Sequence, residues 1–450
     1  MSTQTQTETI VLRTRASTEA IPRELEIPNN GPREPKWLYF KIISAGTSFF
    51  VAGVNDGSLG SLIPYVLRTY DIGTNMVAIL YGTTFFGWLI AALTNSSITQ
   101  NLDLGPILSL GAAVQIIAHA LRVWEPPFAL YAVTFFLASL GQAYNDTHAN
   151  TFVSTLSGAH RWLGFIHAMY AAGCLVGPFV ATGVASANAD SKWYLFYLFP
   201  LGLGVVNFAL VAVSFRDRMA APRVLREAMR AREGSKSALK EIKDTLSTPG
   251  VWLLSLFFFF FLGATITAGG WMVEYLVKVR NGDVKDMGYV PAGFFGGVFL
   301  GRLLLTEPTH RFGERRMIFL YALLCVGLQL VFWLSGILQY SYTLTNSSKS
   351  SVPNIITEAV AVSLLGFFSG PFFATGISVG SKIFSPEIRS SAIAFVFVLG
   401  QIGGSVFPAL TGIIAGKVGV QVLQPMLVGL LGAAGVSWLI LPRDADLHRD

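Results

Sequence analysis

The feature that most constrains this chain is a series of apolar stretches, each about 20 residues long, that recur along most of its length. A stretch of that length spans the hydrocarbon core of a bilayer as an α-helix, in which every backbone polar group is hydrogen-bonded within the segment. We predict six spans, a polar segment and six further spans. They are expected at 41–66, 75–95, 105–122, 127–149, 162–185 and 193–215, and then at 250–278, 287–305, 316–338, 355–381, 390–416 and 420–441.

Composition favours a membrane protein over a soluble one. Hydrophobic residues make up 52% of the 450 residues and charged residues only 13%, whereas soluble domains carry roughly a quarter charged residues. The deficit of charge indicates a surface that faces lipid. The net charge of +6 does not predict a nucleic-acid partner, because the Lys and Arg residues lie in short gaps between apolar stretches and form no single patch.

The spacing of the spans predicts an all-α membrane protein with twelve transmembrane helices in two six-helix halves. The expected divisions are a cytosolic tail at 1–36, a bundle at 37–215, a basic cytosolic linker at 216–249, a second bundle at 250–441 and a short tail at 442–450.

The distribution of basic residues predicts the topology. With the N-terminus in the cytosol, the tails and inner loops hold 23 of the 32 Lys and Arg residues and the outer loops hold 8, while Arg302 falls inside a span. Cytosolic loops carry the excess of positive charge in membrane proteins, so we expect both termini in the cytosol. The plasma membrane is the expected location, with an internal membrane as the alternative. The sequon at Asn346 would then lie in an outer loop, open to glycosylation.

No enzyme signature stands out in the sequence. There is no HExxH, no GxSxG, no Walker A loop and no CxxC pair. ATP is therefore excluded as the direct energy source, which leaves an ion gradient or the gradient of the solute itself. The isolated Cys174 and Cys325 are expected to be small core residues. We expect no metal and no cofactor.

Polar residues inside the first and fourth spans are the strongest candidates for function, because ionisable groups at membrane depth are costly. The first span contains Asn55 and Asp56. In the fourth, Gln142, Asp146 and Asn150 are four residues apart and share one helical face, which requires a polar neighbour. A carboxylate in a partly desolvated cavity can exchange a proton near neutral pH, so Asp56 and Asp146 are the candidate proton-coupling groups. The alternative is a structural role.

Further candidates for solute binding lie in the fifth and seventh spans. His167 and Tyr170 share a face of the fifth span, and Thr267, Trp271 and Glu274 share a face of the seventh. Aromatic rings beside hydrogen-bonding groups suit a polar solute with an apolar face, such as a sugar. Glu274 is close to the outer end of its span, and in the alternative interpretation it simply extends to the surface.

The sequence resembles the major facilitator superfamily in one inner loop. Gly301-Arg302 and the stretch His310-Arg311-Phe312-Gly313-Glu314-Arg315-Arg316 are similar to the loop signature of that family, and the corresponding loop of the first half keeps only Asp103-Leu104-Gly105. The resemblance implies gating or loop-motif roles for Arg302, Gly313, Arg315 and Arg316.

Within that superfamily the sequence resembles the fucose permease branch and its fungal relatives. The matching motifs are Asn55-Asp56, Asp146-Thr147-His148-Ala149-Asn150-Thr151-Phe152-Val153, Arg161-Trp162, His167-Ala168-Met169-Tyr170 and Gly269-Gly270-Trp271 with Tyr275.

The resemblance implies a monomeric major facilitator fold and sugar–proton symport, with Asp56 and Asp146 at the positions implicated in coupling and sugar recognition. The fourth span has Asp where the branch has Glu, and His167 and Tyr170 stand where the bacterial sugar permease has amide side chains. These differences leave the solute open. A proton-antiport exporter of a metabolite or drug is the main alternative, and a non-transporting membrane receptor is a further one.

Overall fold

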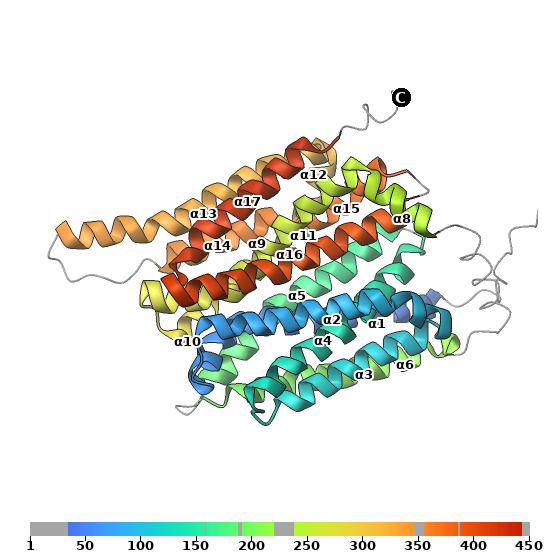
Figure 1. The fold of residues 1–450 in the computed structure, drawn as a ribbon, viewed down its shortest axis with the longest axis horizontal. Coiled ribbons are helices and arrows are strands. Elements are labelled where there is room, and N and C mark those ends of the chain that lie inside the picture. The colour runs from blue at the N-terminus through green and yellow to red at the C-terminus, as the bar shows by residue number, and fades with distance from the viewer. Residues whose placement is uncertain are drawn as a thin grey trace, which may run out of the picture.

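The computed structural model of the chain describes residues 35–157, 159–187, 191–219, 238–345, 355–385 and 388–442. These residues form α-helices, short 3-10 helices and turns, and none of the described residues is in a β-strand. The long helices lie roughly alongside one another in a single bundle (Figure 1). The predicted all-α fold is confirmed.

The first half of the chain folds into six long helices. α3 begins at an N-cap, Asp103, whose carboxylate accepts a hydrogen bond from the Leu104 amide at 2.8 Å. The elements are α1 (Pro35–Thr69), α2 (Thr74–Asn101), α3 (Leu104–Arg122), α4 (Phe128–Ser154), α5 (Ala159–Ser186), η1 (Trp193–Tyr197), α6 (Leu198–Ser214) and η2 (Arg216–Arg218).

The second half contains six more spans and several short helices between them. The segment expected as one span at 355–381 is two helices, interrupted at Gly370 and Pro371, because proline cannot continue the backbone ladder of a helix. The elements are α8 (Ala238–Ser247), α9 (Pro249–Arg280), α10 (Val284–Met287), α11 (Val290–Leu304), α12 (Thr306–Phe312), α13 (Glu314–Thr345), α14 (Ile355–Ser369), α15 (Phe372–Ile383), α16 (Arg389–Val418), η3 (Val420–Val422) and α17 (Leu423–Ile440).

The two ends of the bundle can be told apart by the linker. We call the end at which α6 stops and α9 starts the linker end, and the opposite end, where α10 lies, the far end. In Figure 1 the linker end is on the right and the far end on the left. Of the predicted linker at 216–249, the structure describes η2, α8 and the short stretches beside them.

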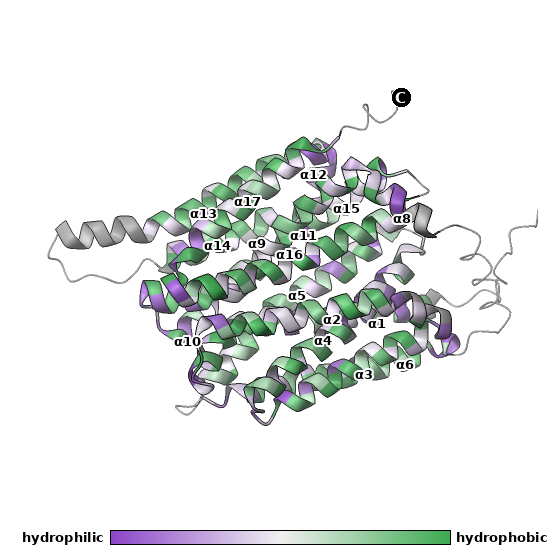
Figure 2. Ribbon diagram, in the orientation of Figure 1, coloured by the Kyte–Doolittle hydropathy of each residue, from purple (hydrophilic) through white to green (hydrophobic). Residues whose placement is uncertain are grey.

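The outer surface of the bundle suits a bilayer. Eleven helical spans among the described residues are long and apolar enough to cross a membrane, and Figure 2 shows hydrophobic residues along the helices with hydrophilic ones gathered mostly at the two ends. The twelfth span, α4, falls short of that apolar composition because its second half carries many polar residues, among them Gln142, Asn145, Asp146, His148 and Asn150. Those side chains are supported by protein instead of lipid, since α4 packs between α2 and α3.

The two halves are held together mainly by the helix pairs α2 with α16, α5 with α11, and α1 with α9. The α1–α9 contact is at backbone distance, because a Cβ added to Gly60 would lie only 1.9 Å from the carbonyl oxygen of Gly269. Close to it, the Ser61 hydroxyl donates to the carbonyl oxygen of Gly288 at 2.8 Å. These contacts lie toward the far end, so the halves are closed against each other there.

Candidate functional site

Asp56, near the middle of α1, is the centre of a hydrogen-bonded cluster in the first half. Its side chain is exposed although α1 lies inside the bundle, so the carboxylate faces open space between helices. Oδ2 accepts hydrogen bonds from Gln142 Nε2 of α4 at 2.8 Å and from the Tyr170 hydroxyl of α5 at 2.9 Å. Oδ1 accepts one from Asn55 Nδ2 at 3.0 Å. We call Asn55, Asp56, Gln142 and Tyr170 the Asp56 cluster.

A close approach of α1 to α5 positions this cluster. A Cβ added to Gly53 would lie 2.0 Å from the carbonyl oxygen of Tyr170, so only glycine fits at this point. Asp56 follows Gly53 by about one helical turn and therefore shares its face. The small residue thus brings the Tyr170 hydroxyl within hydrogen-bonding distance of the Asp56 carboxylate.

Arg122 of α3 contacts the cluster through Asn55 and is a further candidate site residue, one that polarity within the predicted spans did not single out. Its NH1 group donates to Asn55 Oδ1 at 3.0 Å and its Nε to Thr134 Oγ1 at 2.7 Å. The guanidinium is only 1% exposed and lies 4.0 Å from the ring centroid of Phe135 and 4.9 Å from that of Tyr197. Cation–π contacts of this kind stabilise a desolvated cation.

The signal that would have identified Arg122 lies in the sequence. Arg122 ends the third predicted span, and the count of basic residues by loop places it in an outer loop. The structure corrects that placement, because the side chain is buried in the bundle. Gln115, His119 and Arg122 follow one another at helical spacing, and all three are at most 2% exposed. Polar residues on one face of a span indicate a protein-facing surface.

Asp146 lies one turn beyond Gln142 on α4 and is buried, with 5% exposure. Gln142, whose amide donates to Asp56, precedes Asp146 by one helical turn and shares a face of α4 with it. Among the described residues, Asp146 Oδ1 has no hydrogen-bond partner. Asn150, the third member of the predicted stripe, is half-buried and makes no hydrogen bond to this cluster. Its role in binding stays a prediction.

His167 and Arg302 join the two halves on the linker-end side of the Asp56 cluster. Arg302 NH1 of α11 donates to the backbone oxygen of His167 of α5 at 2.6 Å. The His167 ring lies between Phe49 of α1, at 5.2 Å, and Phe373 of α15, at 4.8 Å between ring centroids. The arrangement places a charged side chain and an aromatic group across the boundary between the halves.

The three candidates on α9 lie elsewhere. Thr267 and Trp271 are fully buried, and Glu274 is 2% exposed. The Trp271 indole donates to the backbone oxygen of Pro408 of α16 at 2.9 Å, a packing contact within the second half. Glu274 does not reach the surface, so the alternative interpretation of that residue is wrong. Among the described residues, none of these three forms a hydrogen bond or ring contact with the Asp56 cluster.

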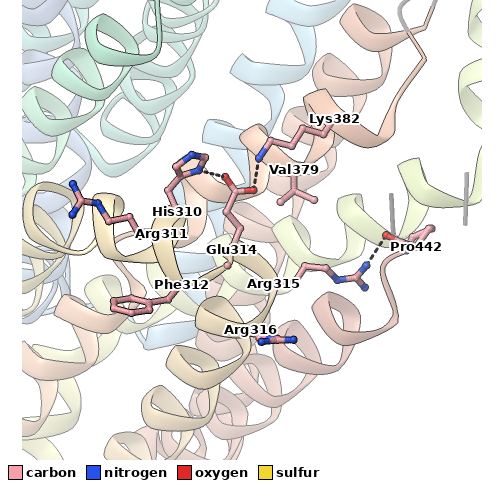
Figure 3. Close-up of a pocket in the computed structure, with 10 residues that line it drawn as sticks. His310, Arg311, Phe312, Glu314, Arg315, Arg316, Val379, Lys382 and Pro442 are labelled. Carbon is pink, nitrogen blue, oxygen red and sulfur yellow. Dashed lines mark hydrogen bonds and ion pairs between the residues drawn. The ribbon is translucent and has the colours of Figure 1, made fainter. Parts of the chain in front are cut away.

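The loop motif lies at the linker end. Gly313 forms the turn between α12 and α13, and Arg315 donates to the backbone oxygens of Leu441 and Pro442 at the end of α17 (Figure 3). Arg316 is exposed. Asn346, the predicted glycosylation site, lies outside the described residues. Within the described part of the chain, no group of three or more His, Cys, Asp or Glu side chains is placed to hold a metal ion.

A family model described as the Major Facilitator Superfamily matches residues 45–352. A curated relative, "Bypass of stop codon protein 6" from Saccharomyces cerevisiae, is 25% identical over 429 residues, covering 91% of this chain and 84% of that protein.

Solved transporter structures share the fold. A D-xylose–proton symporter aligns with a TM-score of 0.71 at 12% identity, over 91% of this chain and 98% of that one. A bacterial homologue of the human lysosomal transporter Spinster aligns with a TM-score of 0.68 at 12% identity, over 92% and 98%. The transporter FucP in its outward conformation aligns with a TM-score of 0.61 at 16% identity, over 89% and 98%. At these identities the likeness is one of fold.

Proposed function

The chain belongs to the Major Facilitator Superfamily, and from that premise we propose that it is a proton-coupled secondary transporter that moves a small organic solute by alternating access. As a member of that family it is a multi-pass membrane transporter and not an enzyme. The observation that carries the proposal is the Asp56 cluster, in which an exposed carboxylate inside the bundle meets three side-chain donors. An ionisable group held at membrane depth in this way is a functional candidate by default.

The hydrogen bonds of Asp56 link a proton to solute binding. In the ionised form the Oδ2 atom accepts from both Gln142 and Tyr170. When that oxygen carries a proton it is a donor and a poor acceptor, so at least one of the two side chains is released. The released amide or hydroxyl can then bind a solute hydroxyl. Proton loading therefore changes the set of donors that the solute meets.

Asp146 is the second proton-coupling residue in this proposal. It is buried one turn from Gln142, and its Oδ1 atom has no hydrogen-bond partner among the described residues. Gln142 donates to Asp56 and lies one helical turn from Asp146, so a change of charge at Asp56 alters the surroundings of Asp146. Two linked carboxylates provide a path for a proton between the buried and the exposed position.

The polar character of the cluster favours a hydroxyl-rich solute such as a sugar. Asn55, Gln142 and Tyr170 offer amide and hydroxyl groups, and the fold is shared with a D-xylose–proton symporter. Export of an amphipathic metabolite or drug by proton antiport is the second candidate. The observation that favours it is the apolar aromatic wall that Phe49 and Phe373 build around His167.

The linker end is cytosolic in this proposal, because that end carries most of the basic residues. Residues 37–215 and 250–441 act as two units that rock against each other around the Asp56 cluster. Arg302 and His167 would then form a contact between the halves that has to break when the linker end opens.

The proposal is tested by solute-dependent proton movement in proteoliposomes, with hexoses, polyols, organic acids and amphipathic drugs as candidate solutes. Asp56→Asn and Asp146→Asn are expected to abolish coupled proton flux while leaving the protein folded. Asp71→Asn is the matched control, because Asp71 is exposed at the far end and has a left-handed backbone that Asn tolerates. Solute transport without proton movement, unchanged in both variants, would exclude proton coupling through these residues.

A further inference from the structure

A cavity of about 390 Å³ opens at the linker end of the second half, well away from the Asp56 cluster. It lies where the α12–α13 turn meets α15 and the end of α17 (Figure 3). Its lining residues are His310, Arg311, Phe312, Gly313, Glu314, Arg315, Arg316, Val379, Lys382 and Pro442.

The cavity is strongly cationic. Four of its lining side chains carry a positive charge, and a single carboxylate, that of Glu314, opposes them. That carboxylate is already occupied, since Oε2 accepts from Lys382 Nζ at 2.7 Å, and Oε1 accepts from the Ser378 hydroxyl at 3.0 Å and lies 3.2 Å from His310 Nδ1. Glu314 therefore organises the cavity wall and has little capacity left to repel an anion.

Arg316 is the cation that remains available. It is exposed, and among the described residues it takes part in no ion pair. Arg311, by contrast, is paired with Glu307 at 2.7 Å on the same helix. Arg316 therefore has no acidic partner among the described residues, and the cavity that it lines is large enough to hold an anionic group.

The surface next to the cavity is apolar. Arg316, Leu320 and Leu323 follow one another along one face of α13, and the two leucines are 47% and 55% exposed. Phe312 at the cavity rim is 70% exposed, and Ile440 near the end of the adjacent α17 is 58% exposed. A cationic cavity directly above an apolar, outward-facing stripe matches a molecule with an anionic head and hydrocarbon chains.

We propose that this cavity binds the phosphate-bearing headgroup of an anionic phospholipid, whose acyl chains lie along the Leu320–Leu323 face of α13. The inference uses the proposed cytosolic position of the linker end, because the cytosolic leaflet contains the anionic lipids and basic pockets between helices on that side bind their headgroups. A bound headgroup would connect α13 with α15 and α17, three helices of the second half that meet at this point.

The test measures retained lipid on the full-length protein. Purified protein is placed in nanodiscs of phosphatidylcholine with added phosphatidylserine of the same acyl chains, and the bound phosphatidylserine is counted by native mass spectrometry and by titration. We expect Arg316→Gln to weaken binding about fivefold, since one basic residue near a membrane surface contributes on the order of 1 kcal/mol. Arg316→Lys should keep most of the affinity, because the charge remains.

Arg161→Gln is the matched control, since Arg161 is an exposed arginine at the linker end of α5 in the other half. Equal loss of phosphatidylserine in Arg316→Gln and Arg161→Gln would overturn the proposal, because the effect would then reflect net charge alone. Displacement of the lipid by inorganic phosphate as readily as by phosphatidylserine would also overturn it, and would identify a site for a soluble anion. Neither result depends on solute transport, so the proposal can fail while the transport function stands.

Discussion

At the scale of the residue, Arg122 decides how the Asp56 cluster is oriented. The guanidinium donates to Asn55 Oδ1, and this contact turns the amide of Asn55 so that its NH₂ group donates to Asp56. Arg122 thus donates to Asn55, and Asn55 donates in turn to the Asp56 carboxylate. Arg122 donates to Asn55 and Thr134 and makes no hydrogen bond to Asp56, so we expect it to act as a positioning residue.

We expect Arg122→Gln to reduce solute-dependent proton flux about tenfold, which corresponds to about 1.4 kcal/mol. Asn55 loses its charged donor and its amide is free to turn away from Asp56. The free energy of unfolding should also fall by about 1–3 kcal/mol, because buried polar groups lose their partner. Proton flux and thermal unfolding are measured together, and Arg122→Lys should restore part of the flux.

Arg68→Gln, at the exposed end of α1, is the control. Unchanged flux in a folded Arg122→Gln protein would contradict the positioning role.

At the scale of the element, a buried ion pair holds the far ends of three helices of the second half. Arg280 Nε of α9 lies 2.8 Å from Glu358 Oε1 of α14, and their side chains are 9% and 3% exposed. Arg280 also donates to the backbone oxygens of Phe332 and Trp333 of α13. Removing one partner of a buried pair leaves the other charge uncompensated, which costs more than the pair itself contributes.

We therefore expect Glu358→Gln to lower the free energy of unfolding by about 3–5 kcal/mol. The comparison is Glu307→Gln, which removes the carboxylate from the exposed Arg311–Glu307 pair and should cost less than about 1 kcal/mol. Thermal unfolding of the purified protein in detergent measures both. Similar melting temperatures for the two variants would show that Arg280 is not left uncompensated.

At the scale of the whole molecule, the contact between α1 and α9 sets how tightly the halves close at the far end. The backbone approach at Gly60 leaves no space for a side chain. The proposed alternating access requires this contact to open, so its strength would contribute to the balance between the open and closed far end. A small residue at this position permits the closed state.

We expect Gly60→Val to shift this balance toward the open far end by about 5- to 150-fold, because overpacking costs about 1–3 kcal/mol in the closed state. Spin labels on Asp71→Cys and Lys285→Cys, one in each half, report the distance between the far ends, and the native Cys174 and Cys325 are buried. Gly82→Val is the control, since a Cβ there would meet open space. Identical distance distributions in the two variants would refute the role of Gly60.

The sequence by itself determined the spans and the polar side chains within them, which have the highest free-energy cost at membrane depth. Long apolar stretches cannot be placed elsewhere than in lipid or a protein core, so each predicted span is found as helix, and Asp56, Gln142 and Tyr170 were identified by their polarity. Pro64, Pro178, Pro371 and Pro408 can each kink a span, but the sequence did not show which of them ends a helix: the break falls at Pro371, whereas the other three lie inside the continuous helices α1, α5 and α16.

Only the tertiary structure decided which polar residues meet. The spacing of Arg122 with Gln115 and His119 indicates a protein-facing side chain, but only the packing of α3 against α1 and α4 supplies Asn55 and Thr134 as its acceptors. Trp271 has the sequence pattern of a cavity residue, whereas in the structure its indole donates to the Pro408 carbonyl oxygen of α16. Periodicity fixes the face of a helix on which a side chain lies, whereas its partner depends on how neighbouring helices are packed and rotated. That information is distributed over contacts between residues far apart in the chain.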